Sequence, residues 1–310
     1  MSKKINFVTY SSYRYLPQFL QFYNSINKYN NNVIYVLCID EKIYSYLKKN
    51  KLNNVKIFNS QTLKINNKKK INQYIAISRL RFVKYLFKKG INKIHLIDSD
   101  VFFYSNPIIL EKIVKKFSTA FCYHNFFLNS THFENRYGIY NAGYIFLKNN
   151  IDGNFFLEKY ISLCEKELNW DVINNIKNNF ADQTYLEYLD SICKNILKIR
   201  DKGINYGPWN IENYSITLKK GFLFANNTRL IFYHFSGAKK INKNTYSLGL
   251  RQYVKNKKHL KKYIYNNYIA KIFLSDSNKG IFNHNGIKNK FLNSLRLLKI
   301  FLHKDYLKVA

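Results

Sequence analysis

Short apolar runs alternate with longer amphipathic segments over the first hundred residues of the chain. The short runs predict β-strands, at residues 5–10, 33–39, 55–58 and 93–97. The longer segments carry apolar residues at helical spacing and predict helices, at residues 16–27, 41–49 and 71–88. Strands separated by helices indicate βαβ units and a mainly parallel sheet. The second strand (VIYVLCI) is apolar throughout, which favours a sheet with helices on both faces.

The pattern becomes mixed after Pro107. It predicts further helices, at residues 108–116, 154–168 and 182–189, and further strands, at residues 119–123, 140–147 and 229–235. The chain has 3 prolines and no internal repeat, so we expect no long linker. The fold class is therefore expected to be α/β, with one Rossmann-like domain over residues 1–240 and a basic helical C-terminal extension over residues 241–310.

The composition is that of a folded and strongly basic protein. Of the 310 residues 46% are hydrophobic, and 27 Tyr and 25 Phe suffice for a large core. The formal net charge of +33 indicates an anionic partner, which is a nucleic acid, an acidic lipid or a phosphorylated substrate. The charge is uneven, because residues 239–310 hold 17 Lys and Arg against two acidic residues, Asp276 and Asp305.

Cysteine usage and the lack of long apolar runs bear on the compartment. The cysteines are scattered, without a CxxC pair: Cys38, Cys122, Cys164 and Cys193. They are expected to be neutral thiols in a reducing cytosol. The first residues lack the apolar stretch of a signal peptide, and no run of about 18 apolar residues occurs. We expect a cytoplasmic protein that is either soluble or attached to the inner face of the membrane.

Two carboxylates, Asp98 and Asp100, follow the apolar strand at residues 93–97. Open α/β sheets place their ligands at this end of their strands. The chain has 18 acidic residues, so a pair inside an apolar run is unusual, and burying it without partners would be costly. Carboxylate oxygens suit Mg²⁺ or Mn²⁺, which bridge acidic side chains and substrate phosphates. The pair predicts a metal site, with a surface turn or pairing with arginines as the alternatives.

Six short segments follow one another between about residues 5 and 240: VTYSS at 8–12, SRLRF at 78–82, LIDSDV at 96–101, YNAGYIFL at 140–147, ADQTYL at 181–186 and FYHFSGAKK at 232–240. In this order they resemble the segments of nucleotide-sugar glycosyltransferases of the GT-A fold, namely glycosyltransferase family 8 and its bacterial capsule and lipopolysaccharide relatives. The resemblance implies transfer of a sugar from a nucleotide-diphosphate donor, with UDP as the nucleotide. It also implies retention at the anomeric carbon and a cell-surface glycan or glycolipid as the acceptor.

The resemblance implies three metal ligands. Asp98 and Asp100 match the family's DxD motif, and His234 matches a third ligand from the far end of the domain. Mn²⁺ tolerates such a mixed shell of oxygen and imidazole ligands, and Mg²⁺ is the alternative ion. Without the resemblance, a lone histidine after a strand is usually a core or surface residue.

The resemblance also places eight residues around the donor: Thr9, Tyr10, Arg79, Asp98, Ser99, Gly143, Gly237 and Lys240. Thr9 and Tyr10 occupy the nucleotide position, where an aromatic ring can stack on the base. Arg79 stands where the family has a basic residue for the donor's phosphate or sugar; otherwise it is a solvated helix arginine. Lys240 corresponds to a phosphate-contacting lysine, although the family often continues with Pro-Trp where this chain has Ile-Asn.

Three further residues match the family's sugar pocket, in which we expect the catalytic groups: Asn141, Asp182 and Gln183. Amides and carboxylates are suitable there, because sugar hydroxyls need both donors and acceptors. Asn141 is otherwise part of a strand bulge, and Asp182 otherwise marks an ordinary helix N-terminus. Trp209 and Asn210 are candidates for the acceptor site, where the indole stacks on a sugar unless it is a buried turn residue.

The basic extension is expected to form an amphipathic helix. Residues 289–302 have an apolar face with basic residues largely elsewhere, and residues 255–263 add a run of lysines. Such a helix either lies on an anionic membrane surface or packs on its own domain with solvated lysines.

Two other functions compete with the transferase. The charge and aromatic content would suit a nucleic-acid-binding protein, but no known module for that purpose is present. A carboxylate pair at a strand end would repel phosphate without a metal, so we expect no specific nucleic acid partner. The other competitor is a catalytically inactive relative, against which the intact Asp98, Asp100 and His234 argue.

Overall fold

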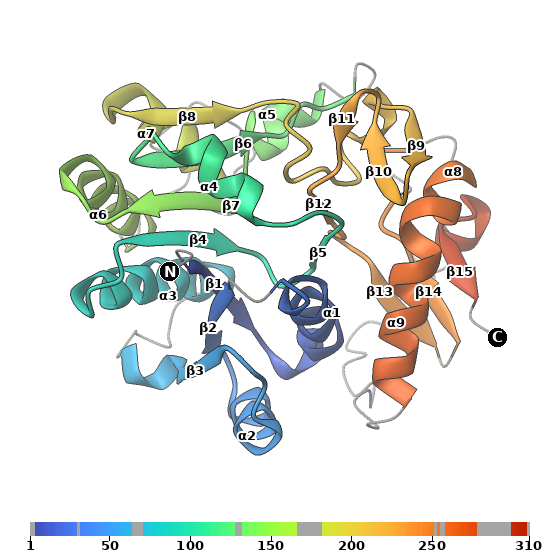
Figure 1. Ribbon diagram of the computed structural model, residues 1–310, viewed down its shortest axis with the longest axis horizontal. Coiled ribbons are helices and arrows are strands. Elements are labelled where there is room, and N and C mark those ends of the chain that lie inside the picture. Colours follow the sequence, from blue (N-terminus) through green and yellow to red (C-terminus); the bar gives the residue numbers. More distant parts are fainter. Residues whose placement is uncertain are drawn as a thin grey trace.

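The computed structural model describes residues 4–29, 32–63, 71–127, 132–165, 182–242, 244–250, 253–254, 258–277 and 299–308. A seven-stranded sheet lies at its centre, in the order β3-β2-β1-β4-β7-β6-β8 (Figure 1). The strands are β1 (Ile5–Ser11), β2 (Asn32–Cys38), β3 (Val55–Asn59), β4 (Lys93–Ile97), β6 (Thr119–Tyr123), β7 (Tyr140–Lys148) and β8 (Ile196–Ile199). Only β7 runs antiparallel to its neighbours, β4 and β6. The expected mainly parallel sheet is confirmed.

Helices cover both faces of this sheet. One face packs against α1 (Leu16–Asn27), α2 (Glu41–Asn50) and α4 (Ile108–Val114). The other face packs against α3 (Ile71–Lys88), α6 (Ile151–Glu165) and α7 (Tyr185–Ile192). Side chains of β2 alternate between the two cores, with Val36 in the first and Leu37 in the second. This alternation explains why the strand is apolar throughout.

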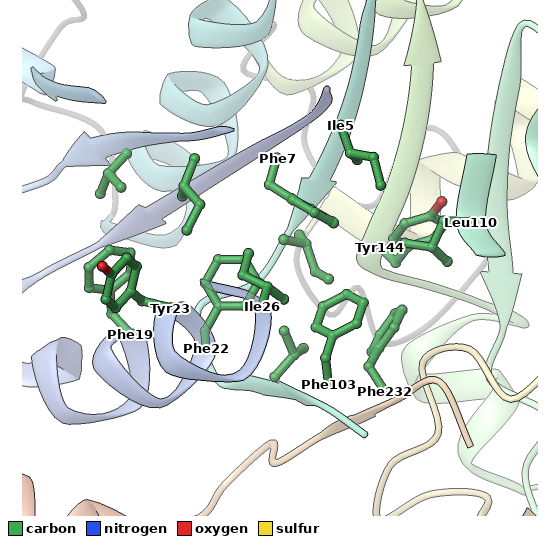
Figure 2. Close-up of a cluster of buried hydrophobic side chains, with 14 of the residues drawn as sticks. Ile5, Phe7, Phe19, Phe22, Tyr23, Ile26, Phe103, Leu110, Tyr144 and Phe232 are labelled. Carbon is green, nitrogen blue, oxygen red and sulfur yellow. The ribbon is translucent and has the colours of Figure 1, made fainter. Parts of the chain in front are cut away.

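The core between β1 and α1 is aromatic (Figure 2). The ring of Phe7 lies 6.1 Å from that of Phe22 and 5.6 Å from that of Phe103, centroid to centroid. Such pairs contribute about 0.5–1.5 kcal/mol each beyond the burial of their area. Phe103 ends β5 (Val101–Phe103), which follows directly on the turn with the two aspartates. The buried ring therefore anchors that turn to the core.

A second, antiparallel pair of strands brings a distant segment to the same turn. β12 (Phe232–His234) pairs with β5 so that His234 lies opposite Val101. The predicted strand at residues 229–235 is divided, because Ile231 donates its N–H to Gly203. Its first residue, Arg229, belongs to a small sheet of β9 (Ile216–Lys219), β10 (Phe222–Ala225) and β11 (Thr228–Arg229). The pairing of β12 with β5 thus positions the histidine beside the acidic turn.

The remaining elements of the domain are short. They are the helix α5 (Glu134–Tyr137) and the 3₁₀ turns η1 (Tyr13–Tyr15), η2 (Ser60–Leu63), η4 (Asp182–Thr184) and η5 (Ile211–Asn213). The four cysteines are free thiols. Burial raises the pKa of Cys38 to about 12, so this thiol is neutral at ordinary pH.

The described part of the C-terminal extension packs on the domain (Figure 1). It contains α8 (Lys258–Leu260), the π-helical turn η6 (Lys261–Tyr265) and α9 (Asn266–Ser277), and it adds the strands β14 (Thr245–Ser247) and β15 (Tyr306–Lys308) beside β13 (Lys239–Asn242). Tyr268 of α9 stacks on Phe235, and Gln21 of α1 donates to the carbonyl of Lys271. The helices of the extension were expected, whereas its strands were not. Most of the predicted helix at residues 289–302 lies outside the described residues.

Candidate active site

A cavity of about 590 Å³ opens at the carboxyl ends of β1 and β4. Tyr10 comes from the end of β1, and Asp98 and Asp100 follow β4. Because β7 is antiparallel, its first residues, including Asn141 and Gly143, reach the same edge of the sheet. The cavity therefore lies where open α/β sheets bind ligands, and its volume is in the range of small-molecule sites.

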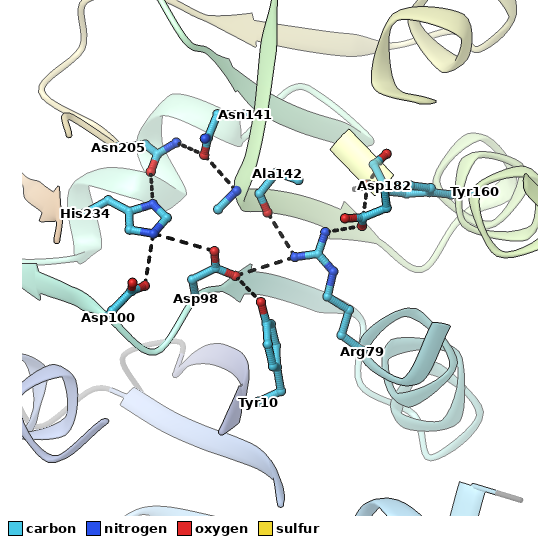
Figure 3. A network of polar contacts seen from close by, with 11 residues as sticks. Tyr10, Arg79, Asp98, Asp100, Asn141, Ala142, Tyr160, Asp182, Asn205 and His234 are labelled. Carbon is cyan, nitrogen blue, oxygen red and sulfur yellow. Dashed lines mark hydrogen bonds and ion pairs between the residues drawn. The ribbon is translucent and has the colours of Figure 1, made fainter. Parts of the chain in front are cut away.

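Asp98, Asp100 and His234 form a cluster in this cavity that could hold a metal ion (Figure 3). The Nε2 atom of His234 lies 3.0 Å from Oδ1 of Asp100 and 3.6 Å from Oδ2 of Asp98, and the three ligand atoms lie within 4.8 Å of one another. Ligands about 2.1 Å from an octahedral cation are about 3 Å from their neighbours. Two carboxylates and one imidazole at this spacing fit a divalent cation. The sequence prediction that these three residues meet agrees with the structure.

The charges in this cluster perturb one another. Burial lowers the pKa of His234, but the charge of Asp100, the hydrogen bond to it and the charge of Asp98 outweigh burial, so that the pKa is raised. Burial also raises the pKa of the Asp98 carboxyl, and His234 and Arg79 offset this only in part. Three carboxylates, of Asp98, Asp100 and Asp182, meet one guanidinium, that of Arg79, in this network. With a neutral His234, as metal binding requires, a divalent cation would balance the remaining negative charge.

Arg79 of α3 joins the two acidic ends of the network (Figure 3). Its guanidinium donates to Asp182 and, at 3.2 Å, to the carbonyl of Ala142, and it lies 3.5 Å from Asp98. The residue is 4% exposed, which excludes a solvated helix arginine. Arg79 therefore lines the cavity, where it is already engaged with protein groups, and its contact with the donor stays a prediction. The contact between Arg79 and Asp98 also fits, in part, the alternative to a metal site, namely that the aspartates pair with arginines.

Tyr10 contacts the same aspartate. Its hydroxyl donates to Oδ1 of Asp98 at 2.9 Å, and its ring lies 5.8 Å from the Arg79 guanidinium. Burial, followed by the charge of Asp98, raises the pKa of Tyr10 well above its usual value. The hydroxyl therefore remains a donor and fixes the orientation of the Asp98 carboxylate.

The three residues expected at the sugar, Asn141, Asp182 and Gln183, all line the cavity. Asp182 accepts hydrogen bonds from Arg79 and, at 2.9 Å, from Tyr160. Gln183 donates to the carbonyl of Tyr137 at 2.8 Å. Asp182 and Gln183 do open a helical turn, but both are buried and bonded across the domain, unlike an ordinary exposed helix start.

Trp209 lines the cavity and is also a buried turn residue, at 4% exposed. Its indole meets the ring of His234 edge to face, with 5.2 Å between centroids. Asn210 does not line the cavity, since its side chain accepts from Gly207 and donates to the carbonyl of His124, both at 3.0 Å. Asn210 therefore holds the turn that presents Trp209, and a direct contact with an acceptor stays a prediction.

The structure places two predicted donor residues, Thr9 and Lys240, outside the cavity lining. Thr9 is fully buried in β1. On β13, neighbouring side chains point to opposite faces, and it is Lys239 that lines the cavity. The other six predicted donor residues line it, namely Tyr10, Arg79, Asp98, Ser99, Gly143 and Gly237. Contacts of Thr9 and Lys240 with the donor stay predictions.

Gly143 has a clear steric role. A Cβ atom at this position would lie 2.5 Å from Cε1 of His234, closer than real Cβ contacts. The glycine therefore lets the histidine ring approach β7. The Asn141-Ala142-Gly143 motif thus leaves room for the ring of His234 and also lines the cavity.

The sequence reasoning missed cavity residues from the C-terminal extension. Ser247, Gly249 and Tyr253 all line the cavity, beyond the expected domain boundary at residue 240. Gly249 has φ +75°, and a Cβ there would lie 2.5 Å from the carbonyl oxygen of Ser236. No motif marks these residues, because their place depends on the pairing of β13 with β14.

The comparisons with known proteins agree with this fold and site. A family model described as nucleotide-diphospho-sugar transferase matches residues 30–206, more than half of the chain, so the chain belongs to this family of GT-A glycosyltransferases. The protein YfnD of Bacillus subtilis (strain 168) is 26% identical over 230 residues, which are 69% of this chain and 71% of YfnD. The chain is thus a glycosyltransferase with a predominantly parallel α/β sheet.

The solved structure of a galactosyltransferase shows the same fold. The galactosyltransferase LgtC, in complex with donor and acceptor sugar analogues, has a TM-score of 0.52 and 13% identity, with 75% of this chain and 87% of that chain covered. The glycosyltransferase GlyE of Streptococcus pneumoniae TIGR4 has a TM-score of 0.44 and 19% identity, with 65% of this chain covered. The chain spans 46% of the length of GlyE. Among the described residues, no helix has both the length and the apolar character needed to cross a bilayer.

Proposed function

We propose that this glycosyltransferase moves a sugar from a UDP-sugar, with retention at the anomeric carbon, to a hydroxyl of a cell-surface glycan or glycolipid. The observation that carries the proposal is the convergence of Asp98, Asp100 and His234 on one point of the cavity. UDP and retention follow the sequence resemblance to family 8. A sugar acceptor is also in keeping with LgtC, which was crystallised with donor and acceptor sugar analogues.

The three ligands would hold Mn²⁺ or Mg²⁺. When bound, the ion supplies positive charge that offsets the negative charge developing on the diphosphate leaving group. The protein's part is to orient the ligands. Tyr10 and Arg79 hold Asp98 from one side, and Trp209 packs against the ring of His234.

The rest of the cavity is assigned to the donor and acceptor. Ser99, Gly143 and Gly237 line it near the metal cluster and are proposed to face the donor. Lys239 is proposed to contact a donor phosphate, because it is the lysine of this segment that lines the cavity. Asp182 and Gln183, with Asn141, are proposed to bind the transferred sugar and to stabilise its cation-like transition state. The aromatic surface of Trp209 is proposed for the acceptor.

Calorimetric titration with UDP, Mn²⁺ and both together tests the proposal. We expect UDP to bind at least about 10-fold more tightly with Mn²⁺ present, and we expect Asp100→Asn and His234→Ala to lose this difference. Glu158→Gln is the matched control, because Glu158 is an exposed acid of α6 outside the cavity. Equal UDP affinity with and without Mn²⁺ would overturn the metal assignment. Slow hydrolysis of a panel of UDP-sugars then identifies the donor.

The extension is proposed to attach the enzyme to the inner face of an anionic membrane. The support is its basic charge together with exposed apolar side chains, since Leu274, Phe301 and Leu302 are 60%, 41% and 71% exposed. In co-sedimentation with phosphatidylglycerol vesicles, Phe301→Ser/Leu302→Ser should bind at least about 3-fold more weakly. Leu218→Ser, an exposed position on β9, is the control. Equal binding to phosphatidylcholine vesicles would contradict the electrostatic part.

A further inference from the structure

Four buried side chains link the backbone at residue 138 to the metal cluster. Nδ1 of His124 lies 2.9 Å from the carbonyl oxygen of Gly138, and its Nε2 lies 3.0 Å from Nδ2 of Asn141. Oδ1 of Asn141 lies 2.8 Å from Nδ2 of Asn205, and Oδ1 of Asn205 lies 3.2 Å from Nδ1 of His234 (Figure 3). These side chains are at most 6% exposed, so water cannot readily replace their partners.

Two backbone groups fix the direction of each hydrogen bond in the series that runs from Gly138 to His234. The carbonyl of Gly138 can only accept, so Nδ1 of His124 carries its proton and Nε2 is free to accept from Asn141. The N–H of Gly143 can only donate, and it lies 2.8 Å from Oδ1 of Asn141. Both ends therefore give the same orientation of the Asn141 amide, in which its nitrogen faces His124 and its oxygen faces Asn205.

The orientation of the Asn141 amide also sets the directions of the hydrogen bonds of Asn205 and His234. Because Oδ1 of Asn141 accepts, Asn205 turns its Nδ2 toward Asn141 and its Oδ1 toward His234. The amide oxygen can only accept, so Nδ1 of His234 donates. The remaining ring nitrogen, Nε2, faces Asp98 and Asp100. A neutral imidazole in this tautomer directs its lone pair at the position where the proposed cation would lie.

Burial keeps His124, at the other end of this hydrogen-bonded series, in one protonation state. His124 is 3% exposed, and burial lowers its pKa to about 3, so it is neutral and has a single acceptor nitrogen at any ordinary pH. Trp209 packs edge to face against both histidine rings, with centroids 5.6 Å from His124 and 5.2 Å from His234. The indole therefore restricts the tilt of both rings, while the hydrogen bonds set their protonation sites.

We propose that Asn205 is a positioning residue which, together with Asn141 and His124, locks His234 in the Nδ1–H tautomer for metal binding. The inference rests on the proposed function for the metal but concerns residues outside the ligand set. Partners that hold the second nitrogen of a metal-binding histidine typically change metal affinity by about 10- to 100-fold when removed. Asn205 lies in a segment that carried no motif in the sequence.

Nitrogen NMR of histidine-labelled protein tests the tautomer without activity. The spectra are recorded with saturating Mg²⁺, which is diamagnetic. We expect a pure Nδ1–H signature for His234 and His124 in the unmodified protein. In Asn205→Ala, we expect the Nδ1–H proton of His234 to exchange with water faster, because its acceptor is gone, and the Mn²⁺ dissociation constant, from titration calorimetry, to rise about 10- to 100-fold. Asn32→Ala is the control, because Asn32, like Asn205, is a buried amide. It donates to a backbone carbonyl and does not line the cavity.

Asn205→Asp keeps the inference falsifiable if the alanine variant does not fold. It retains an acceptor for Nδ1 of His234 but loses the donor to Asn141, so we expect the Nδ1–H signature of His234 to persist. An Nε2–H signature in the unmodified protein would overturn the inference, as would unchanged exchange of the His234 Nδ1–H proton and unchanged Mn²⁺ affinity in Asn205→Ala. Failure of the unmodified protein to bind Mn²⁺ would overturn the proposed function, whereas a slowly exchanging Nδ1–H proton of His234 in the metal-free protein, lost in Asn205→Ala, would still support the role of Asn205.

Discussion

Two buried histidines, His95 and His234, contact carboxylates in this molecule, and their surroundings are opposite. His95 of β4 is fully buried, with Nδ1 at 2.9 Å from the Tyr144 hydroxyl and Nε2 at 3.0 Å from Glu111. Lys93 donates to the other oxygen of Glu111 at 2.8 Å. Every group of this cluster has a matched partner. Around His234, by contrast, two aspartates meet and their charge is only partly matched.

The pKa shifts of the two histidines express this difference. Burial lowers the pKa of His95, and its neighbours do not reverse the shift. At His234 the two aspartates outweigh burial and raise the pKa. A neutral His95 donates to Glu111 and accepts from Tyr144, which completes a structural cluster. The comparison teaches that unbalanced charge, rather than burial, distinguishes the candidate metal ligand His234 from the structural His95.

The largest expected effect is on activity, at the unbalanced cluster. Asp100→Asn should lower metal-dependent transfer at least about 100-fold, because the ion loses a charged ligand. The free energy of unfolding without metal should change by less than about 1 kcal/mol, since like charges near Asp98 are relieved as the contact to His234 weakens. Turnover assays and urea unfolding measure the two effects. Unchanged turnover in Asp100→Asn would show that the cluster around His234 is not needed for activity.

A smaller effect is expected from crowding the same histidine. Gly143→Ala would place a Cβ against the His234 ring, so the ring must shift, and we expect Mn²⁺ to bind about 10- to 100-fold more weakly. Gly90→Ala is the control, because φ +83° strains it while no atom lies within 4 Å of the new Cβ. The control should lose stability without loss of Mn²⁺ affinity. Equal affinity in both variants would show that the Gly143 contact is unimportant.

The fold could be predicted because its periodic segments are long and local. The helices at residues 16–27 and 71–88 were predicted with the observed bounds, and β2 was predicted within one residue. Strands of three or four residues carry too little periodicity to be predicted, and those missed were β5, β8, β9, β10, β13, β14 and β15. Their existence depends on pairing with distant partners, which one sequence does not reveal.

The site could be predicted only where ordered motifs carried it. Asp98, Asp100 and His234 lie together as the resemblance implied. The structure instead places Lys239 in the cavity lining where Lys240 was expected, because strand alternation decides which of two adjacent lysines faces inward. Asn205 was missed altogether, since only the folded backbone brings it between Asn141 and His234.

The next prediction concerns the cluster of His95, Glu111 and Lys93, in which each charged group has a partner. Glu111→Gln should leave turnover within about twofold but lower the free energy of unfolding by roughly 1–3 kcal/mol, since Lys93 and His95 lose a charged partner. Urea unfolding of this variant and of Asp100→Asn, side by side without metal, measures the contrast. If Asp100→Asn proves the more destabilising of the two, the roles assigned to the clusters are reversed.

The smallest effect concerns pH and the same glutamate. The hydrogen bond from His95 lowers the pKa of Glu111 from 4.5 to about 2, against the effect of burial. A lowered pKa in the folded state stabilises the protein above the ordinary value, and this stability is lost as pH falls from about 4.5 through about 2. After allowance for solvent screening we expect a loss of about 1–2 kcal/mol across this range.

Acid titration of the unfolding free energy separates this contribution from those of other carboxylates. In Glu111→Gln the acid limb of the profile should become shallower by that amount, because the variant has no proton to take up at this position. An acid limb that Glu111→Gln leaves unchanged would show that His95 and Lys93 do not stabilise the ionised carboxylate of Glu111.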